Sequence, residues 1–81
     1  MNPPPIEDKF FEILSALLAV PADRLGRESS RKSIESWDSL KQMHLVLALE
    51  EAFEIEFDDH EIADLVSAAA LLDSILEKLT Q

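Results

Sequence analysis

The chain has 81 residues, 47% of them hydrophobic, which is enough for one small core and rules out a second domain. Its 17 Asp and Glu residues outnumber its 7 Lys and Arg residues, and the formal net charge of −10 repels nucleic acids and anionic lipid surfaces. The absence of Cys excludes disulfides, thiolate metal sites and a cysteine nucleophile. We expect a single domain over residues 1–81 that acts as a monomer without a nucleic-acid partner.

A Pro-rich leader occupies residues 1–5 and lacks both the basic region and the long apolar region of a signal peptide. No apolar run approaches the roughly 20 residues that span a bilayer, so we expect a cytoplasmic protein without membrane insertion. The first helix should end near Val20, because Pro21 disfavours a helical conformation in the residue before it. Its apolar stripe consists of Ile6, Phe10, Ile13, Leu14 and Leu17.

Residues 22–37 form a long polar connection. We expect its isolated apolar residues, Leu25, Ile34 and Trp37, to anchor it to the core. Strand signals are weak throughout, because β-branched residues are scattered and no segment alternates apolar and polar residues for long. The prediction is therefore an all-α four-helix bundle with three main helices and one short helix.

The remaining helices are predicted over residues 39–54, 59–65 and 68–79. Asp58 is a good N-cap for the short third helix, and Glu61 stands where the second member of a capping box belongs. Ser67 is a suitable cap for the fourth helix, whose apolar residues recur at helical spacing.

The predicted second helix has two apolar faces. One face should pack into the bundle and consists of Leu45, Val46, Leu49 and Phe53. The nearly opposite face carries three apolar residues followed by three acidic ones: Leu40, Met43, Leu47, Glu50, Glu51 and Glu54. Such a surface suits a partner with a hydrophobic notch in basic surroundings. Alternatively, the long connection or the third helix covers the three apolar residues.

Acidic and basic residues are unevenly distributed along the chain. Residues 1–32 contain five acidic and five basic residues, whereas residues 33–81 contain twelve acidic residues against Lys41 and Lys78. The whole net charge therefore lies in the second part, which is typical of a face that meets basic partners or of a solvated acidic surface.

Ser39 opens the second helix directly after Asp38. A hydroxyl at this position lies beside free backbone N–H groups and the positive end of the helix dipole, which would stabilise a phosphate ester. Asp and Ser are also the ordinary N-cap residues, so a bare Asp-Ser pair before a helix is far more often a simple cap than a modification site.

Three segments together resemble the acyl carrier proteins: Trp37-Asp38-Ser39-Leu40, the run Leu45-Val46-Leu47-Ala48-Leu49-Glu50-Glu51-Ala52-Phe53, and Ile55-Glu56-Phe57-Asp58-Asp59. The resemblance implies a non-enzymatic carrier in which a phosphopantetheinyl transferase attaches 4'-phosphopantetheine to Ser39, with Asp38 in a supporting role. It also implies an arm that holds acyl groups as thioesters and a core that can enclose an acyl chain. Enzymes that load and process acyl groups would dock on the second helix through basic surfaces.

Some positions depart from the family pattern. Ser36 replaces a common glycine, and Trp37 introduces a large ring that we expect to be half-buried. Lys41 and His44 lie beside the docking stripe, at positions that are often acidic in fatty-acid carriers. These two basic side chains favour a specialised lipid or secondary-metabolite pathway over the general fatty-acid synthase.

Two alternative functions remain from the sequence. One is a peptidyl or aminoacyl carrier, and the other is an acidic helical adaptor in which Asp38 and Ser39 only cap a helix. The segment around His60 lacks the second His of a zinc-protease helix, so we expect no metal and a solvent-facing His60. His44 follows Ser39 too closely on one helix to serve as its general base, so we expect no catalytic residues.

Overall fold

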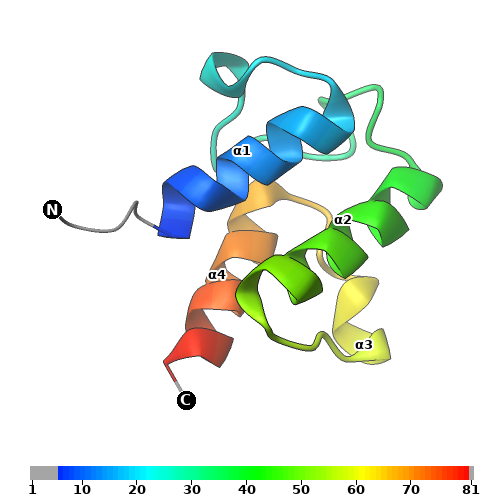
Figure 1. The fold of residues 1–81 in the computed structure, drawn as a ribbon. Coiled ribbons are helices and arrows are strands. Elements are labelled where there is room, and N and C mark those ends of the chain that lie inside the picture. Colours follow the sequence, from blue (N-terminus) through cyan, green and yellow to red (C-terminus); the bar gives the residue numbers. More distant parts are fainter. Residues whose placement is uncertain (1–5, 81) are drawn as a thin grey trace, which may run out of the picture.

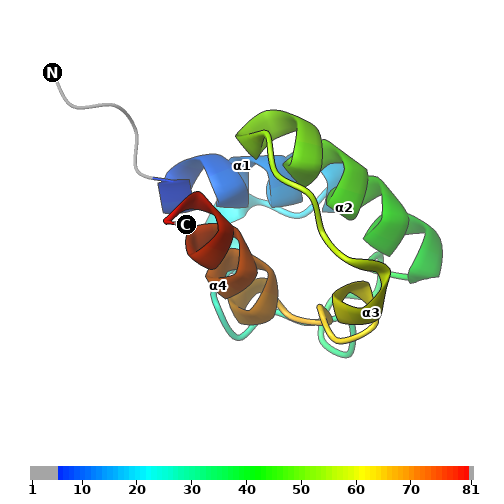
Figure 2. The same cartoon turned by 90° about the horizontal axis from the view of Figure 1, so that it is seen from below.

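The computed structural model describes residues 6–80, so the predicted leader at residues 1–5 lies outside the described residues. Its elements in order are α1 (Ile6–Leu18), the 3-10 helix η1 (Ala22–Arg24), α2 (Ser39–Phe53), α3 (Asp59–Ile62) and α4 (Ala68–Leu79). The predicted all-α four-helix architecture is confirmed. Figures 1 and 2 show α1 and α2 side by side in roughly opposite directions, with the short α3 leading from α2 to α4. None of the described helices is both long and apolar enough to cross a membrane.

One hydrophobic core joins the three long helices. Its completely buried side chains include Phe10, Leu14, Leu18, Leu45, Leu49, Leu71, Leu72 and Ile75. Phe10, Leu14 and Leu18 are four residues apart and so lie on one face of α1. Ile6, at the start of the predicted stripe, is exposed. The predicted inner face of α2 is confirmed for Leu45, Val46 and Leu49, and Phe53 at its end packs half-buried against the core.

Two helices end in a left-handed residue that is not glycine. The first helix ends slightly before the predicted position near Val20, because Ala19 has a φ of 56° and terminates α1 after Leu18. Glu54 has a φ of 55° and likewise ends α2 at Phe53, one residue before the predicted end. This conformation turns the chain out of a helix, and glycine is the residue that usually adopts it.

The third helix is shorter than the predicted range of residues 59–65. It ends at Ile62, and the chain continues through Leu65 in tight turns. Gln42 on α2 binds this turn, because its buried amide Nε2 donates to the carbonyls of Leu65 at 2.7 Å and Ile62 at 3.3 Å. A side chain of α2 thus binds carbonyls at the C-terminal end of α3, where the helix supplies no N–H group four residues later. At the start of α3, the Asp58 N–H donates to Glu61 Oε1 at 3.1 Å, as the predicted capping interaction requires.

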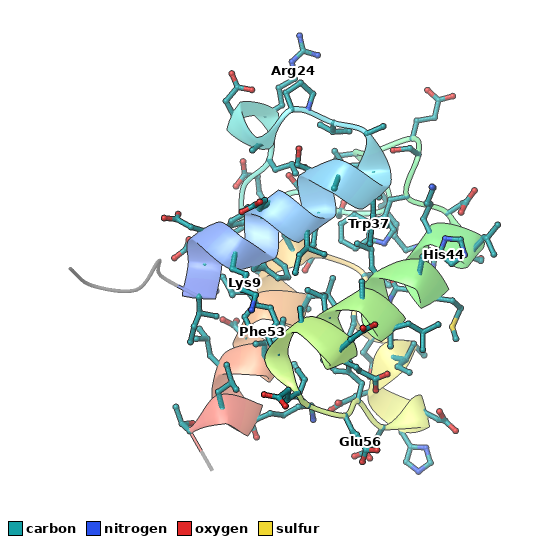
Figure 3. All side chains as sticks on the ribbon, in the orientation of Figure 1. Lys9, Arg24, Trp37, His44, Phe53 and Glu56 are labelled. Atoms are coloured by element: carbon teal, nitrogen blue, oxygen red, sulfur yellow. The ribbon has the colours of Figure 1, made fainter. Side chains whose placement is uncertain are left out.

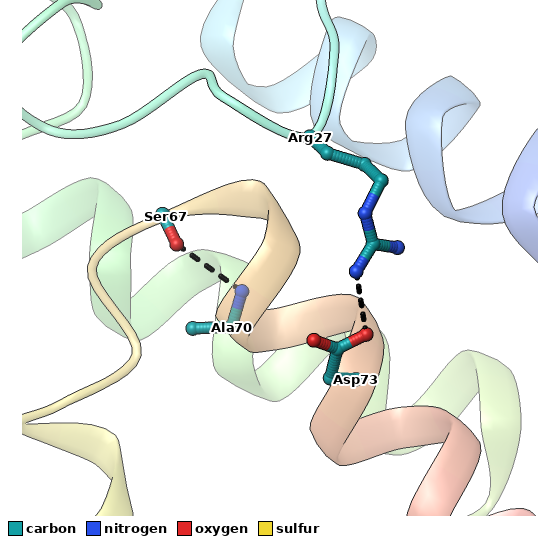
Figure 4. Close-up of polar contacts among 4 residues, drawn as sticks. All are labelled: Arg27, Ser67, Ala70 and Asp73. Atoms are coloured by element: carbon teal, nitrogen blue, oxygen red, sulfur yellow. Dashed lines mark hydrogen bonds and ion pairs between the residues drawn. The ribbon is translucent and has the colours of Figure 1, made fainter.

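The long connection before α2 is fixed to the N-terminus of α4. The carbonyls of Ser29 and Arg27 accept hydrogen bonds from the N–H groups of Ala68 at 2.8 Å and Ala69 at 3.0 Å. As predicted, Ser67 caps the helix, because its Oγ accepts the next N–H, that of Ala70, at 3.1 Å. Figure 4 shows this cap together with the ion pair of Arg27 and Asp73, whose atoms lie 2.7 Å apart. The connection is therefore an ordered part of the fold.

The three residues expected to anchor this connection all pack against or within the core. Leu25 and Ile34 pack half-buried against the core. Trp37 was expected to be half-buried, which is wrong: its side chain is 2% exposed. Its indole N–H donates to Gln42 Oε1 at 2.7 Å, so the polar atom of the ring has a partner inside the core and the whole ring can be buried.

Candidate functional site

Asp38 and Ser39 divide their roles at the start of α2. Asp38 has an extended backbone, and its Oδ1 accepts the N–H of Lys41 at 2.9 Å, so Asp38 is the N-cap. Ser39 is the first residue of the helix, and its side chain is exposed. The cap therefore does not use the Ser39 hydroxyl, which leaves this oxygen accessible at the helix terminus.

A basic side chain from the long connection lies against this hydroxyl. Arg31 Nη2 donates to Ser39 Oγ at 3.1 Å. Sequence reasoning did not single out Arg31, which looked like one of several bases in a charge-balanced segment. The contact depends on how the connection is held by α4, and no local pattern around Arg31 signals that geometry.

The residues present suit a phosphate ester on Ser39. The hydroxyl is exposed, so a modifying enzyme can reach it and an attached group has room. Its neighbour Arg31 supplies a cationic donor of the type that binds phosphate well. The first turn of α2 adds the positive end of the helix dipole.

The predicted outer face of α2 is accessible at its apolar end. Leu40, Met43 and Leu47, which we call the apolar patch, are 64%, 48% and 58% exposed. The alternative in which the long connection or the third helix covers these residues is therefore wrong. Three neighbouring apolar side chains at this exposure form a surface that a partner can bury.

The acidic end of the same face is less uniform than predicted. Glu51 and Glu54 are exposed, and we call them the acidic pair. Glu50 is half-buried instead, because its Oε2 accepts the N–H of Phe57 at 2.8 Å. Part of this carboxylate is thus committed to the chain between α2 and α3. Sequence periodicity placed Glu50 on the right face of the helix but gave no sign of this internal hydrogen bond.

The two basic residues of α2 differ in accessibility. His44 is exposed and projects from the helix in Figure 3, whereas Lys41 is half-buried. His60 on α3 is exposed, as predicted. Among residues 6–80, no group of three or more metal-ligating side chains lies close enough together to hold a metal ion.

Comparison with known proteins decides the family. The family model described as "Phosphopantetheine attachment site" matches residues 8–75, a segment that contains Ser39. The chain belongs to the acyl carrier protein family. The acyl carrier protein of Rubrobacter xylanophilus is 34% identical over 77 residues, covering 85% of this chain and 94% of the relative. That of Thermosynechococcus vestitus is 33% identical over 79 residues and covers 98% of each.

The fold comparison agrees with the sequence comparisons. The solution structure of a holo acyl carrier protein from Geobacter metallireducens superposes with a TM-score of 0.82 at 32% identity, covering 94% of this chain and 87% of that one. As a member of this family, the chain is a carrier and not an enzyme, and its cofactor is 4'-phosphopantetheine. When bound, that group supplies a terminal thiol, which this Cys-free chain does not itself contain.

Proposed function

We propose that Ser39 is the residue that carries 4'-phosphopantetheine and that the protein, acting as one domain, presents acyl thioesters on this arm to partner enzymes. The observation that carries the proposal is the exposed Ser39 hydroxyl at the start of α2, unused by the helix cap and contacted by Arg31. Asp38 supports the site by holding the first turn of the helix in place. An adaptor that used Asp38 and Ser39 only as a cap would not require an accessible Ser39 hydroxyl.

We propose further that partner enzymes dock on the outer face of α2. The apolar patch supplies the surface that becomes buried, and the acidic pair supplies charge that attracts a basic partner. The half-buried Glu50 contributes charge at the edge of this face. The partners include the phosphopantetheinyl transferase and the enzymes that load and process acyl groups, and we propose that they work together in the cytoplasm.

The basic residues beside this face support a specialised lipid or secondary-metabolite pathway. His44 presents no negative charge to a basic partner, and the positive charge of Lys41 repels such a partner. Equal turnover of the loaded carrier by general fatty-acid synthase enzymes would contradict this part of the proposal. Loading by an amino-acid-adenylating enzyme would instead favour an aminoacyl carrier.

The first experiment is intact-mass measurement before and after incubation with coenzyme A, magnesium and a broad-specificity phosphopantetheinyl transferase. We expect a gain of one phosphopantetheinyl group, which fragmentation assigns to Ser39. Ser39→Ala should fold normally and gain nothing, whereas Ser33→Ala, a matched change at another exposed serine, should be modified like the parent. An adduct that persists on Ser39→Ala, or no adduct on a folded parent protein, would refute the assignment.

A further inference from the structure

Arg31 is held in place by its own backbone. Its N–H donates to the carbonyl of Val66 at 3.1 Å, and the preceding Ser30 forms an isolated β-bridge with Ser67. The guanidinium that reaches Ser39 therefore extends from a fixed backbone, and its reach does not depend on a mobile loop. Within residues 6–80, the ion pairs are those of Arg27 with Asp73 and Lys78 with Glu61, so the charge of Arg31 is not paired with a carboxylate.

Arg31 also lines a hollow of about 440 Å³. Its lining consists of Ser30, Arg31, Lys32 and Val66. Two of these side chains are cationic, and Val66 presents an apolar surface that is 41% exposed. Arg31 thus belongs both to the hollow and to the hydrogen bond with Ser39, so this one residue connects the two.

The chemistry of the arm matches this lining. Its phosphate is an anion, its next segment carries two methyl groups, and amides follow. A guanidinium binds phosphate oxygens through charge-assisted hydrogen bonds, often through two donors at once. Once Ser39 Oγ becomes an ester oxygen, the phosphate that it carries is directly bonded to the atom that Arg31 now contacts.

We propose that Arg31 binds the phosphate of the arm on Ser39 and that the beginning of the arm lies in the hollow against Val66. This inference rests on the proposed function and adds a positioning residue to it. The carrier then holds the first part of its own arm on its surface. Only the distal part, with the thiol, extends freely toward a partner enzyme.

The test compares unmodified and phosphopantetheinylated forms of the whole protein. Arg31→Ala removes the donor but keeps the backbone N–H that binds Val66. We expect it to lower the thermal midpoint more in the modified form than in the unmodified form, by about 2 °C or more. It should also shift the phosphorus-31 resonance of the arm, and Arg31→Lys should restore part of both effects.

Arg24→Ala is the matched control for removing one positive charge. Arg24 is exposed on η1 and projects away from the start of α2 in Figure 3, so its loss should affect both forms equally. The location of the arm is read from nuclear Overhauser effects between its methyl protons and those of Val66. If Arg31→Ala alters both forms equally and leaves the phosphorus resonance unchanged, the Arg31 contact is wrong although Ser39 is modified. If Ser39 gains no arm, the proposed function itself fails.

Discussion

The indole N–H of Trp37 donates to Gln42 Oε1 at 2.7 Å inside the core, directly below the start of α2. Both side chains are almost completely buried, at 2% and 5% exposure. The amide nitrogen of Gln42 also donates to the carbonyls of Leu65 and Ile62. One glutamine thus satisfies the tryptophan that precedes α2 and the turn that follows α3, so it joins two segments that the helices alone would leave apart.

We predict that Gln42→Leu lowers the free energy of unfolding by about 2 kcal/mol or more. The substitution keeps similar size but leaves the Trp37 N–H and the Leu65 carbonyl without this partner, and each unsatisfied buried group costs about 1–3 kcal/mol. Urea unfolding followed by the fluorescence of the single Trp measures the effect. His44→Leu, the same kind of change at an exposed site of α2, should alter stability by less than about 0.5 kcal/mol. Equal effects of the two changes would contradict the prediction.

We predict that Ala19→Gly stabilises the protein by about 1 kcal/mol. Ala19 adopts a φ of 56°, where an L side chain is strained and glycine is not. The matched control is Ala16→Gly, an identical change at an exposed position inside α1, which should destabilise by a similar amount. Thermal or urea unfolding of the two variants checks the opposite signs. A loss of stability in Ala19→Gly would show that the end of α1 is not left-handed.

We predict that Glu51→Lys weakens binding to the phosphopantetheinyl transferase without altering stability. Glu51 is exposed on the proposed docking face, so its charge acts on the partner and not on the fold. The loss should shrink at high salt, because exposed charges are screened there. Glu77→Lys makes the same charge change at an exposed position of α4 and should bind nearly as the parent does. Titrations at two salt concentrations distinguish them, and equal losses would indicate only a general charge effect.

We predict that the Glu61–Lys78 ion pair contributes stability that is lost in acid. Their charged atoms lie 2.7 Å apart, and the hydrogen bond from Lys78 lowers the pKa of Glu61. A carboxylate with a lowered pKa stabilises the fold above its unfolded value of about 4.3, and this stability disappears as the pH falls through the lowered pKa. The same bond raises the pKa of Lys78, so its contribution is complete at neutral pH and is lost only in strong base.

Urea unfolding of the parent and Lys78→Met between pH 7 and pH 3 measures this contribution. Met keeps the alkyl part of the side chain but also removes the contact of Lys78 Nζ with the Phe57 ring, 5.6 Å from its centroid, so the comparison rests on how stability changes with pH and not on its value at one pH. The parent should lose more stability than the variant below about pH 4.3. Parallel pH profiles would mean that the pair contributes nothing in solution, as many exposed ion pairs do.

Local patterns in the sequence were sufficient for the helices and for part of the site. The bounds of α4 follow from its apolar spacing and from Ser67, and both are as predicted. Helical geometry predicted that the apolar patch shares one face of α2, but it left open whether another segment covers that face, and the structure shows that the patch is exposed. Family resemblance directed attention to Ser39, and the family comparisons confirm that resemblance.

The remaining features depend on contacts between distant segments. Arg31 reaches Ser39 because its backbone pairs with Val66, and no periodicity within residues 22–37 reports such pairing. The turn after α3 is bound by Gln42 of α2, and no pattern within residues 59–65 reports that contact. Ala19 is left-handed although it is not glycine, the residue whose presence usually predicts that conformation. Each of these misses involves a tertiary contact or a strained backbone that overrides local preference.

The attachment of the long connection to the N-terminus of α4 has a consequence for the order of folding. Residues 27–31 bind residues 66–69, so their contact closes a long stretch of chain that contains α2 and α3. Pairings of such distant segments carry a larger entropy cost than local contacts and form slowly. A chain still emerging from the ribosome contains Ser39 and Arg31 well before it contains α4. We therefore expect Arg31 to be fixed against Ser39 only after residues 66–69 have been synthesised.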